Sequence, residues 1–580
     1  MTNRKELIDT AAARRDADLV IKNTRILSTL TGEWWHGDIA ICGEQIAGVG
    51  DSYRGATEID GSALSVVPGF VDCHVHVEST RLVPAEYDRA VLPHGVTTAI
   101  CDPHEMANVC GARAIQYFLD CADTLAMDLF VQLSSCVPAT HMETSGATLT
   151  AADLAPFVEH PRVLGLAEMM NFPAVIAADP AVLEKIALFK NRADGHAPLV
   201  ADHALNAYIA AGIGNDHECT HTAEALEKLR KGLRILLRSG SAAHNIAQFL
   251  PLLRWETAPT IGLCSDDLNI VDICQRGSID EIVRTLLRHA VPSPLAYRLA
   301  SLSGAEIHGL RDRGIIAPGY LADLVLLADP AECRIHSVIK RGRLVTPELF
   351  AARPPAPSPN FARHSVHLEE WKVESGKLKV GLAAPQARGE TFNFRFSTFN
   401  SPVIGIIPDS LLTEKLAYDL PARDGETLAD PTRDILKIAV AARHGKNENI
   451  SVGFVKGFQL RDVALASTVA HDSHNLCVVG TSDTAILRAA NAVIAAEGGQ
   501  CVADENGALA LLPLPVAGLM SDAPYEIVYD QSLALAAAAR ATETPLHDPF
   551  MTLSFLSLPV IPHLKITDRG LVDVDAFRFV

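Results

Sequence analysis

The residues best suited to chemistry in this sequence are two histidines, His74 and His76, within the apolar run 68–77. The run is rich in residues that favour β-structure, so it predicts a strand. Successive side chains of a strand alternate between its two faces, and side chains two positions apart therefore point the same way. His74 and His76 can place both imidazoles on one metal ion, which a pair at this spacing on a helix could not.

The elements that must position such residues repeat along the chain. Between residues 67 and 310, strand-like runs end in polar residues at intervals of roughly 20–35 residues, the length of one βα unit. Eight parallel βα units of this size make a TIM barrel, whose active site gathers at the carboxyl ends of its strands. The fifth and sixth strands have no clear apolar run in the sequence. Their positions are inferred from the candidate ligands expected at their ends, His196 and His217. The expected ends lie near His76, Pro103, Cys136, Glu168, His196, His217, Ser239 and Asp266.

In such a barrel, four histidines and two carboxylates from the strand ends converge. One tetrahedral ion with an open position needs about three protein ligands, so this set is too large for one ion. It fits two divalent ions about 3.5–4 Å apart, with Glu168 as the bridge. His203 is an alternative to His196, Asp267 is an alternative to Asp266, and a structural role for Glu168 stays open. The predicted ligands are His74, His76, Glu168, His196, His217 and Asp266.

Length, charge and cysteine content narrow the class of protein. The chain has 580 residues, enough for several domains, and 48% of them are hydrophobic, which is ordinary for a globular enzyme. Its net charge of −19 argues against nucleic acid as a partner. No apolar window approaches roughly 18 residues, and the N-terminus has no signal-peptide core, so we expect no membrane partner. The 12 cysteines form no C-x-x-C motif, which indicates a cytoplasmic, disulfide-free protein.

Composition shifts divide the chain into units. Short β-prone runs within residues 18–66 find a counterpart near 314–327, so we predict one β module split between segments 1–66 and 311–352. The barrel occupies 67–310. A proline-rich linker at 353–359 precedes a C-terminal domain at 360–580.

Several motifs resemble a known family. The run 68–76 resembles the first-strand motif of the amidohydrolase superfamily, and the run 316–325 resembles that superfamily's exit into a flanking β domain. More narrowly, the chain resembles the bacterial adenine deaminases over nearly its whole length. The matching motifs are His76-Val77-Glu78-Ser79, Cys101-Asp102-Pro103-His104-Glu105, Ser134-Ser135-Cys136-Val137-Pro138-Ala139, 165–170, 194–198 and 217–218, with His471-Asp472-Ser473-His474-Asn475, 514–520 and 555–562 in the C-terminal domain.

The resemblance implies an α/β fold: a distorted TIM (β/α)8 barrel with a flanking composite β-sandwich domain and an additional C-terminal α/β domain. It implies hydrolysis of adenine to hypoxanthine and ammonia in purine salvage, at a binuclear centre that prefers Mn²⁺ or Fe²⁺. His74 and His76 match the ligands of the first ion, and His196 and His217 those of the second. Glu168 takes the bridging place that a carboxylated lysine fills in many other amidohydrolases. The ligand types alone suit Zn²⁺ equally well.

A mechanism follows as a hypothesis. A metal-bound hydroxide attacks C6 of adenine, and Asp266 accepts its proton and passes it to the departing amine. Glu105 or Glu218 supplies or relays a proton to N1 if burial raises its pKa, and we favour Glu105. The segment 471–475 folds over the barrel mouth to contact substrate or an extra cation, or else forms a self-stabilised polar turn. The expected substrate contacts are Glu78, Asp102, His104, Ser135, His471 and His474.

Two other functions compete with this one. The nearest is an amidohydrolase that acts on a different amino-purine or on a cyclic amide, because the same hydroxide attacks either electrophile. The other is a non-catalytic scaffold, which the presence of all six predicted ligands argues against. Apolar helices on the barrel exterior lead us to expect a homodimer.

Overall fold

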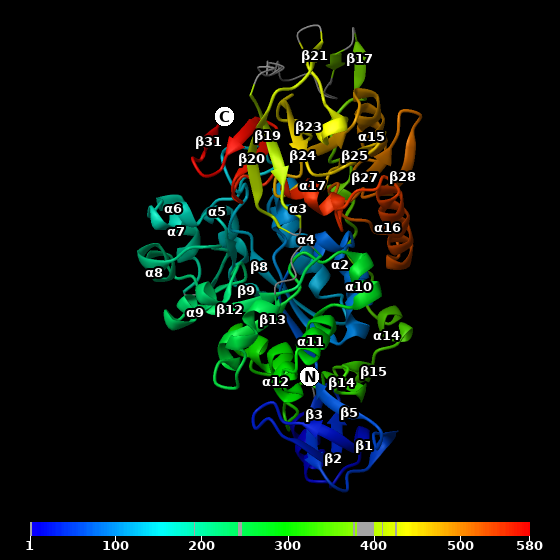
Figure 1. The fold of residues 1–580 in the computed structure, drawn as a ribbon. Coiled ribbons are helices and arrows are strands. Elements are labelled where there is room, and N and C mark those ends of the chain that lie inside the picture. The colour runs from blue at the N-terminus through cyan, green and yellow to red at the C-terminus, as the bar shows by residue number, and fades with distance from the viewer. Residues whose placement is uncertain are drawn as a thin grey trace.

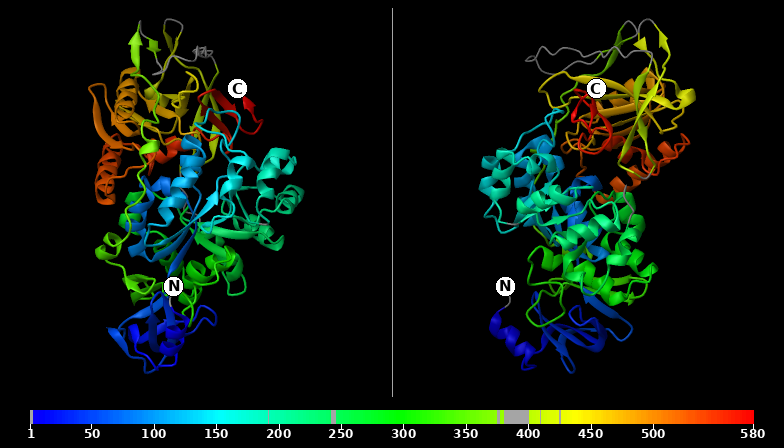
Figure 2. Two further views of the ribbon diagram at one scale, coloured as in Figure 1. Left: turned by 180° about the vertical axis from the view of Figure 1, so that it is seen from behind. Right: turned by 60° about the vertical axis from the view of Figure 1, so that its left-hand side comes forward.

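The structure is a computed structural model that describes residues 3–190, 192–241, 246–374, 377–379, 400–408, 410–423 and 426–580. Its elements form three parts along the length of the molecule (Figure 1). A β-rich part with the N-terminus lies at one end, parallel strands and their helices lie in the middle, and the C-terminal part lies at the other end (Figure 2). Within these described ranges, no helix is long and apolar enough to cross a membrane.

The β-rich end part is built from two segments far apart in the sequence. Strand β14 pairs antiparallel with β5, so that Leu324 lies opposite Pro68 and Leu327 lies opposite Ser65. The eight strands form one sheet in the order β16-β15-β14-β5-β1-β2-β3, with β4 beside β1. The two flanks of the central unit therefore share one sheet. The bounds are α1 (Arg4–Ala11), β1 (Ala17–Leu27), β2 (Trp34–Cys42), β3 (Gln45–Gly50), β4 (Gly55–Asp60), β5 (Ser65–Pro68), β14 (Leu324–Asp329), β15 (Arg334–Lys340) and β16 (Arg343–Leu344).

The central part contains a parallel sheet of five strands, β6 to β10, and a parallel sheet of three, β11 to β13. Parallel bridges join the two sheets at both ends, between Ala193 and Ile213 and between Val75 and Asp266. The strands thus follow one another around a ring, which is consistent with the expected distorted barrel. The bounds are β6 (Phe70–Val75), β7 (Val96–Cys101), β8 (Asp128–Leu133), β9 (Val163–Met169), β10 (Ala193–Gly195), β11 (Asn215–Asp216), β12 (Arg234–Arg238) and β13 (Ile261–Cys264).

The fifth and sixth strands are the weakest in the ring. Strand β10 has three residues and β11 has two, too few for an apolar pattern to mark them in the sequence. The two strands lie very close at Gly195, where a Cβ atom would stand 2.3 Å from the backbone oxygen of Asn215. Glycine is therefore required at the position that directly precedes His196.

Helices surround the ring, and several of them bury one face against it. In α4, the buried residues Ala114, Ile115, Phe118, Leu119 and Ala122 recur at helical spacing. The helices of this part are α2 (Pro84–Val91), α3 (His104–Cys110), α4 (Ala112–Ala122), α5 (Ala151–Leu154), α6 (Phe172–Ile176), α7 (Pro180–Ala187), α8 (Asp202–Ala210), α9 (Thr222–Arg230), α10 (Ile270–Arg276), α11 (Ile279–Arg288), α12 (Ser293–Arg298) and α13 (Gly304–Ile307).

The C-terminal part is an eight-stranded sheet in the order β20-β19-β24-β23-β26-β25-β27-β28, with a three-stranded sheet, β29 to β31, beside it. Helix α15 buries Ile486 and Val493 against Ala464 of β25 and Cys501 of β27. Helix α14 (Pro347–Ala351) follows β16 and lies near β15, outside this part (Figure 1). The bounds within the C-terminal part are β17 (Lys372–Glu374), β18 (Lys377–Lys379), β19 (Ser401–Ile406), β20 (Thr413–Tyr418), β21 (Ala422–Arg423), β22 (Glu426–Thr427), β23 (Ile435–Ala441), β24 (Ile450–Lys456), β25 (Ala464–Ser467), β26 (Leu476–Gly480), α15 (Asp483–Ala495), β27 (Gly499–Ala503), β28 (Ala508–Pro513), α16 (Tyr525–Arg540), α17 (Pro549–Phe555), β29 (Leu564–Thr567), β30 (Gly570–Asp573) and β31 (Arg578–Phe579).

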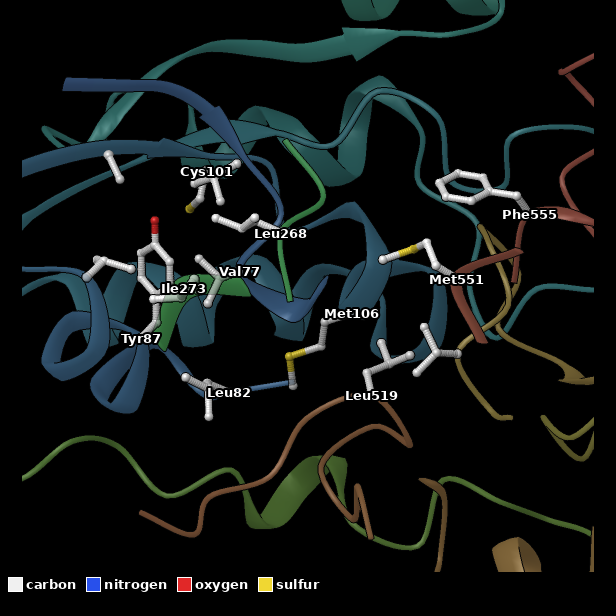
Figure 3. Close-up of a cluster of buried hydrophobic side chains, with 14 of the residues drawn as sticks. Val77, Leu82, Tyr87, Cys101, Met106, Leu268, Ile273, Leu519, Met551 and Phe555 are labelled. Carbon is white, nitrogen blue, oxygen red and sulfur yellow. The ribbon is translucent and has the colours of Figure 1, made fainter. Parts of the chain in front are cut away.

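One hydrophobic core runs from the barrel into the C-terminal part. Figure 3 shows Val77 and Met106 of the barrel in the same cluster as Leu519, Met551 and Phe555. Because apolar area removed from water stabilises the folded state in proportion to its size, this shared core holds the C-terminal part on the barrel. It also fixes the segment around α17 above the carboxyl ends of the barrel strands.

Candidate metal centre

The six predicted ligands come together at the carboxyl ends of the ring strands. His74 lies in β6 and Glu168 in β9. His76, His196 and His217 follow directly after β6, β10 and β11, and Asp266 follows β13 after one intervening residue. All six side chains are buried. The strands end within a few residues of the positions expected from the spacing of polar residues, which explains why the cluster could be assembled from the sequence.

Glu168 lies at the centre of this cluster. Its Oε1 atom is 3.1 Å from His76 Nε2 and 3.7 Å from His74 Nε2. Its Oε2 atom is 2.6 Å from His196 Nδ1 and 3.2 Å from His217 Nε2. One carboxylate oxygen thus faces each pair of histidines, which is the arrangement needed to bridge two ions.

One carboxylate oxygen of Asp266 faces His74 and His76, and the other accepts a hydrogen bond from Arg238. Its Oδ1 atom is 3.6 Å from His74 Nε2 and 3.4 Å from His76 Nε2. Its Oδ2 atom accepts a hydrogen bond of 2.5 Å from Arg238, whose other Nη atom donates to Glu218 at 2.9 Å. Arg238 was missed by the sequence analysis. The available signal was a charged residue at the end of the apolar strand β12, one position before the expected end at Ser239.

The donor set fits divalent cations. The Nε2 atoms of His74 and His76 are only 3.1 Å apart. The Nδ1 atom of His76 lies 3.1 Å from the backbone oxygen of Asp102, so Nδ1 carries the proton and Nε2 offers its lone pair to the cluster. Two overlapping sets of three donors, each within 4.8 Å, share His217: one with His74 and Asp266, the other with Glu168 and His196. Imidazole nitrogen and carboxylate oxygen are ligands of Zn²⁺, Fe²⁺ and Mn²⁺ alike.

Burial and nearby charges act in opposite directions on the acids of the cluster. Burial raises the pKa of Glu168, but His196 and His217 outweigh it and bring that pKa well below its usual range. The pKa of Asp266 is likewise lowered, because Arg238 outweighs burial. Burial and the charge of His217 lower the pKa of His74 to about 4. In contrast, nearby carboxylates outweigh burial and raise the pKa of His76, of His196 and of His217, the last to about 9. Because imidazole binds a metal in its neutral form, metal binding at these three histidines competes with protonation.

The structure also distinguishes between the alternative ligands proposed for two positions, His196 or His203 and Asp266 or Asp267. His203 is exposed on α8, whereas His196 is buried against Glu168. Asp267 lies near His76, but its Oδ1 atom accepts a hydrogen bond of 2.5 Å from the Ser79 hydroxyl. The geometry therefore favours His196 and Asp266 over these two alternatives.

A second polar cluster lies beside the first and is linked to it by His104. The Nδ1 atom of His104 is 3.7 Å from Glu168 Oε1, and its Nε2 atom is 3.8 Å from Glu105 Oε1. Glu105 in turn lies 2.7 Å from His471 Nδ1 and 2.5 Å from His474 Nε2. Burial raises the pKa of Glu105, but the two histidines outweigh it and lower that pKa well below its usual range. The raised pKa on which we based its role as a proton donor is therefore not found in this arrangement.

The C-terminal part forms the roof of the pocket above the metal centre. The ring of His471 stacks on Phe555 with 4.4 Å between the centroids, and Phe555 belongs to the core shared with the barrel (Figure 3). Segment 471–475 thus lies over the barrel mouth. The roof residues are Leu411, His471, Asp472, Phe555, Leu558 and Ile561.

Some of the residues expected to contact substrate lie behind this pocket. Glu78 accepts a hydrogen bond of 3.1 Å from a backbone N–H of helix α3. Asp102 holds the Nδ1 atom of His104 at 2.9 Å, and the Ser135 hydroxyl donates to the backbone oxygen of Glu168 at 2.5 Å. His104 and His471 line the pocket. Among the described lining residues, Glu78, Asp102, Ser135 and His474 do not appear.

A wide, mainly apolar cavity of about 830 Å³ adjoins the metal centre. Its inner end shares His196, Glu218 and Arg238 with the metal pocket. Its outer walls come from both the barrel and the C-terminal part, for example Leu199 and Phe577. The cavity therefore offers a small heterocyclic molecule a path to the cluster.

Comparison with known proteins places this site in a family. Residues 65–345 match the model of the amidohydrolase family, and residues 410–578 match the model of the adenine deaminase C-terminal domain. The chain belongs to the amidohydrolase family. It is 50% identical to an adenine deaminase of Cereibacter sphaeroides over 576 residues, 99% of each chain. It is 48% identical to one of Brucella abortus over 575 residues, 99% of this chain and 96% of that protein. Within the amidohydrolases, the chain belongs to the adenine deaminases.

Proposed function

We propose that this chain hydrolyses adenine to hypoxanthine and ammonia, a reaction of purine salvage. The proposal depends on the position of Glu168 at the carboxyl ends of the ring strands. One of its carboxylate oxygens faces His74 and His76, and the other faces His196 and His217. The relatives that match the chain over nearly its whole length are named for this reaction. The enzyme class is therefore a metal-dependent aminohydrolase.

We propose two divalent ions, Mn²⁺ or Fe²⁺ with Zn²⁺ as an alternative, as its cofactors. The first ion is assigned to His74, His76 and Asp266, and the second to His196 and His217, with Glu168 between them. When bound, such ions lower the pKa of a shared water and supply a hydroxide at neutral pH. The support is two overlapping sets of buried donors, each within 4.8 Å, namely His74, His217 and Asp266, and Glu168, His196 and His217. His76 Nε2 lies 3.1 Å from His74 Nε2 and 3.4 Å from Asp266 Oδ1.

The chain's own residues then hold the substrate and move protons. Asp266 accepts a proton from the attacking water and returns it to the departing amine. Glu218 takes part in proton transfer to the purine ring, and Glu105 assists that transfer through the histidines that it contacts; both carboxylates line the pocket. His104 and His471 contact the substrate from the pocket wall, and Glu78, Asp102, Ser135 and His474 hold that wall in place.

The proposed architecture is a distorted (β/α)8 barrel at 67–310 between the two halves of a β-sandwich domain, 1–66 and 311–352. A C-terminal α/β domain occupies 360–580. The shared sheet of β1–β5 and β14–β16 and the ring of β6–β13 support these divisions. We further propose a cytoplasmic homodimer; in support of a reducing compartment, none of the twelve cysteines forms a disulfide.

Metal reconstitution combined with an ammonia-release assay tests the function. The metal-free protein is titrated separately with Mn²⁺, Fe²⁺ and Zn²⁺. Ammonia release is measured with adenine, adenosine and guanine, and ring opening of a hydantoin, which releases no ammonia, is followed by the carboxylic acid that it forms. We expect adenine to be preferred and full activity to need two equivalents of metal. Full activity with one equivalent would contradict the paired site. Preference for a hydantoin would favour cyclic-amide hydrolysis instead.

A further inference from the structure

Glu105 and His471 form a carboxylate–imidazole pair contributed by two distant parts of the chain. Glu105 lies in the first turn of α3, and His471 lies in the loop after β25. Both side chains are 2% exposed, and Oε1 of Glu105 is 2.7 Å from Nδ1 of His471. The His471 backbone is held by the segment around α17: its N–H donates to Ser554 O, and its carbonyl oxygen accepts from the Ser557 hydroxyl.

His474 fixes the orientation of Glu105. The Nδ1 atom of His474 accepts a hydrogen bond of 3.2 Å from the backbone N–H of Ala470, so in the neutral ring the proton sits on Nε2. That Nε2 atom lies 2.5 Å from Oε2 of Glu105. One carboxylate oxygen thus lies in close contact with His474, without hydrogen-bond geometry, and the other faces His471. The same tautomer argues against a third metal ion among Glu105, His471 and His474, because a protonated Nε2 is not a ligand.

The Nε2 atom of His471, on the ring edge away from Glu105, can form a hydrogen bond with a substrate. Nδ1 faces Glu105, whereas Nε2 is buried without a hydrogen-bonding partner among the described residues. His471 also lines the metal pocket, opposite His76 and Glu168. A buried nitrogen without a partner beside a substrate pocket is unfavourable unless a ligand contacts it.

We propose that His471 is the residue that protonates N1 of adenine and that Glu105 is its positioning partner. This rests on the proposed function. The Nε2–H of the imidazolium passes to N1 as the attacking oxygen bonds to C6 and the C6–N1 double bond opens. The proton lost by the attacking water goes through Asp266 to the amine, which leaves as ammonia when its bond to C6 breaks. The remaining hydroxyl proton on C6 returns to His471 as the carbonyl of hypoxanthine forms.

The charged surroundings of His471 suit an imidazolium. Glu105 of α3, Asp472 of the same loop and Asp267 of the loop after β13 all face it, and Phe555 covers one face of the ring. Burial opposes the charged form, but these carboxylates outweigh it and raise the pKa of His471. A raised pKa favours the protonated imidazolium, which is the form that a proton donor requires.

The test uses the full-length, metal-loaded enzyme and His471→Gln. We expect kcat for adenine to fall about 10²–10³-fold with both metal equivalents retained and KM little changed. Loss of the donor should also remove the fall in activity at alkaline pH, and added imidazole should partly restore kcat in His471→Gly. His364→Gln is the matched control, because His364 is exposed and pairs with Glu497 away from the pocket.

Two results would overturn the inference: a kcat for His471→Gln within threefold of wild type, or loss of activity explained by loss of a metal equivalent. If His471→Gln does not fold, His471→Asn and the imidazole experiment carry the same test. Failure of wild type to release ammonia from adenine would instead refute the proposed function. An active wild type with an unaffected variant would refute the role of His471 alone.

Discussion

Substitution of Lys228 in α9 tests which contacts hold His196 and His217 in position. Its side chain is fully buried, and its Nζ atom is 2.7 Å from the backbone oxygen of Ala197, from Asp216 Oδ2 and from Glu224 Oε1. Ala197 follows His196 in the sequence, and Asp216 precedes His217. One ammonium group therefore ties together the two strand ends that deliver these histidines.

Replacing Lys228 by methionine leaves two buried carboxylates without their cation. Although burial opposes it, Lys228 helps to hold the pKa of Asp216 at about 2, which shows how strongly the pair interacts. Removing one partner of a buried ion pair costs about 3–5 kcal/mol. For a unit of the barrel's size this lowers Tm by about 6–20 °C. We also expect weaker binding of one of the two metal equivalents.

Lys231→Met is the matched control. Lys231 lies on the end of the same helix and also follows its glutamate partner, Glu227, by four residues at 2.7 Å, but 26% of its side chain is exposed. An exposed pair of this kind contributes less than about 1 kcal/mol. Thermal unfolding of the metal-free proteins and titration with Mn²⁺ measure both effects. Equal Tm values for the two variants, with unchanged metal binding, would refute the reasoning.

Three further outcomes are expected. Burial lowers the pKa of Lys565 to about 7, from 10.5 when unfolded, and no carboxylate in the described part of the chain compensates. The unfolded chain therefore binds more protons between these pH values, and stability rises with pH across that window. Lys565→Met should therefore gain stability relative to wild type by at most about 5 kcal/mol at pH 7, and urea unfolding should show this advantage fading toward pH 10.5. Asp266→Asn should keep both metals and lose about 10²–10⁴-fold in turnover, and near-normal turnover at full metal content would contradict its role. Arg238→Met, which frees the outer oxygen of Asp266, should lower kcat/KM about 10- to 100-fold in the ammonia assay, and an unchanged value would show that the arginine is dispensable.

The clustering of the six candidate ligands could be predicted because it depends on the local order of the sequence. A βα unit has a nearly constant length, so polar residues at the ends of apolar runs mark the carboxyl ends of the strands. His74, His76, Glu168 and Asp266 each belong to or follow such a run. His196 and His217 follow strands of three and two residues, and only the chemistry that they must complete pointed to them.

The contacts around these ligands could not be predicted because they join distant segments. Arg238 reaches Asp266 across neighbouring strands, and His471 reaches Glu105 from the other end of the chain. No periodicity in the sequence encodes such pairs. The pKa of Glu105 shows the consequence: burial alone predicts a raised value, and the two histidines of the roof reverse the direction.

The pocket is formed by the barrel and by the C-terminal part, and the ribosome synthesises these two parts at different times. The chain is made from its N-terminus, and domains generally fold as they emerge. Every proposed metal ligand lies between residues 74 and 266, whereas the roof depends on His471 and Phe555. The ring, closed by the pairing of β14 with β5 in the flanking sheet, is thus synthesised long before its cover. The six candidate ligands are thus present on the nascent chain before the roof residues are synthesised, and we expect ion binding to need the barrel alone and turnover to need the roof as well.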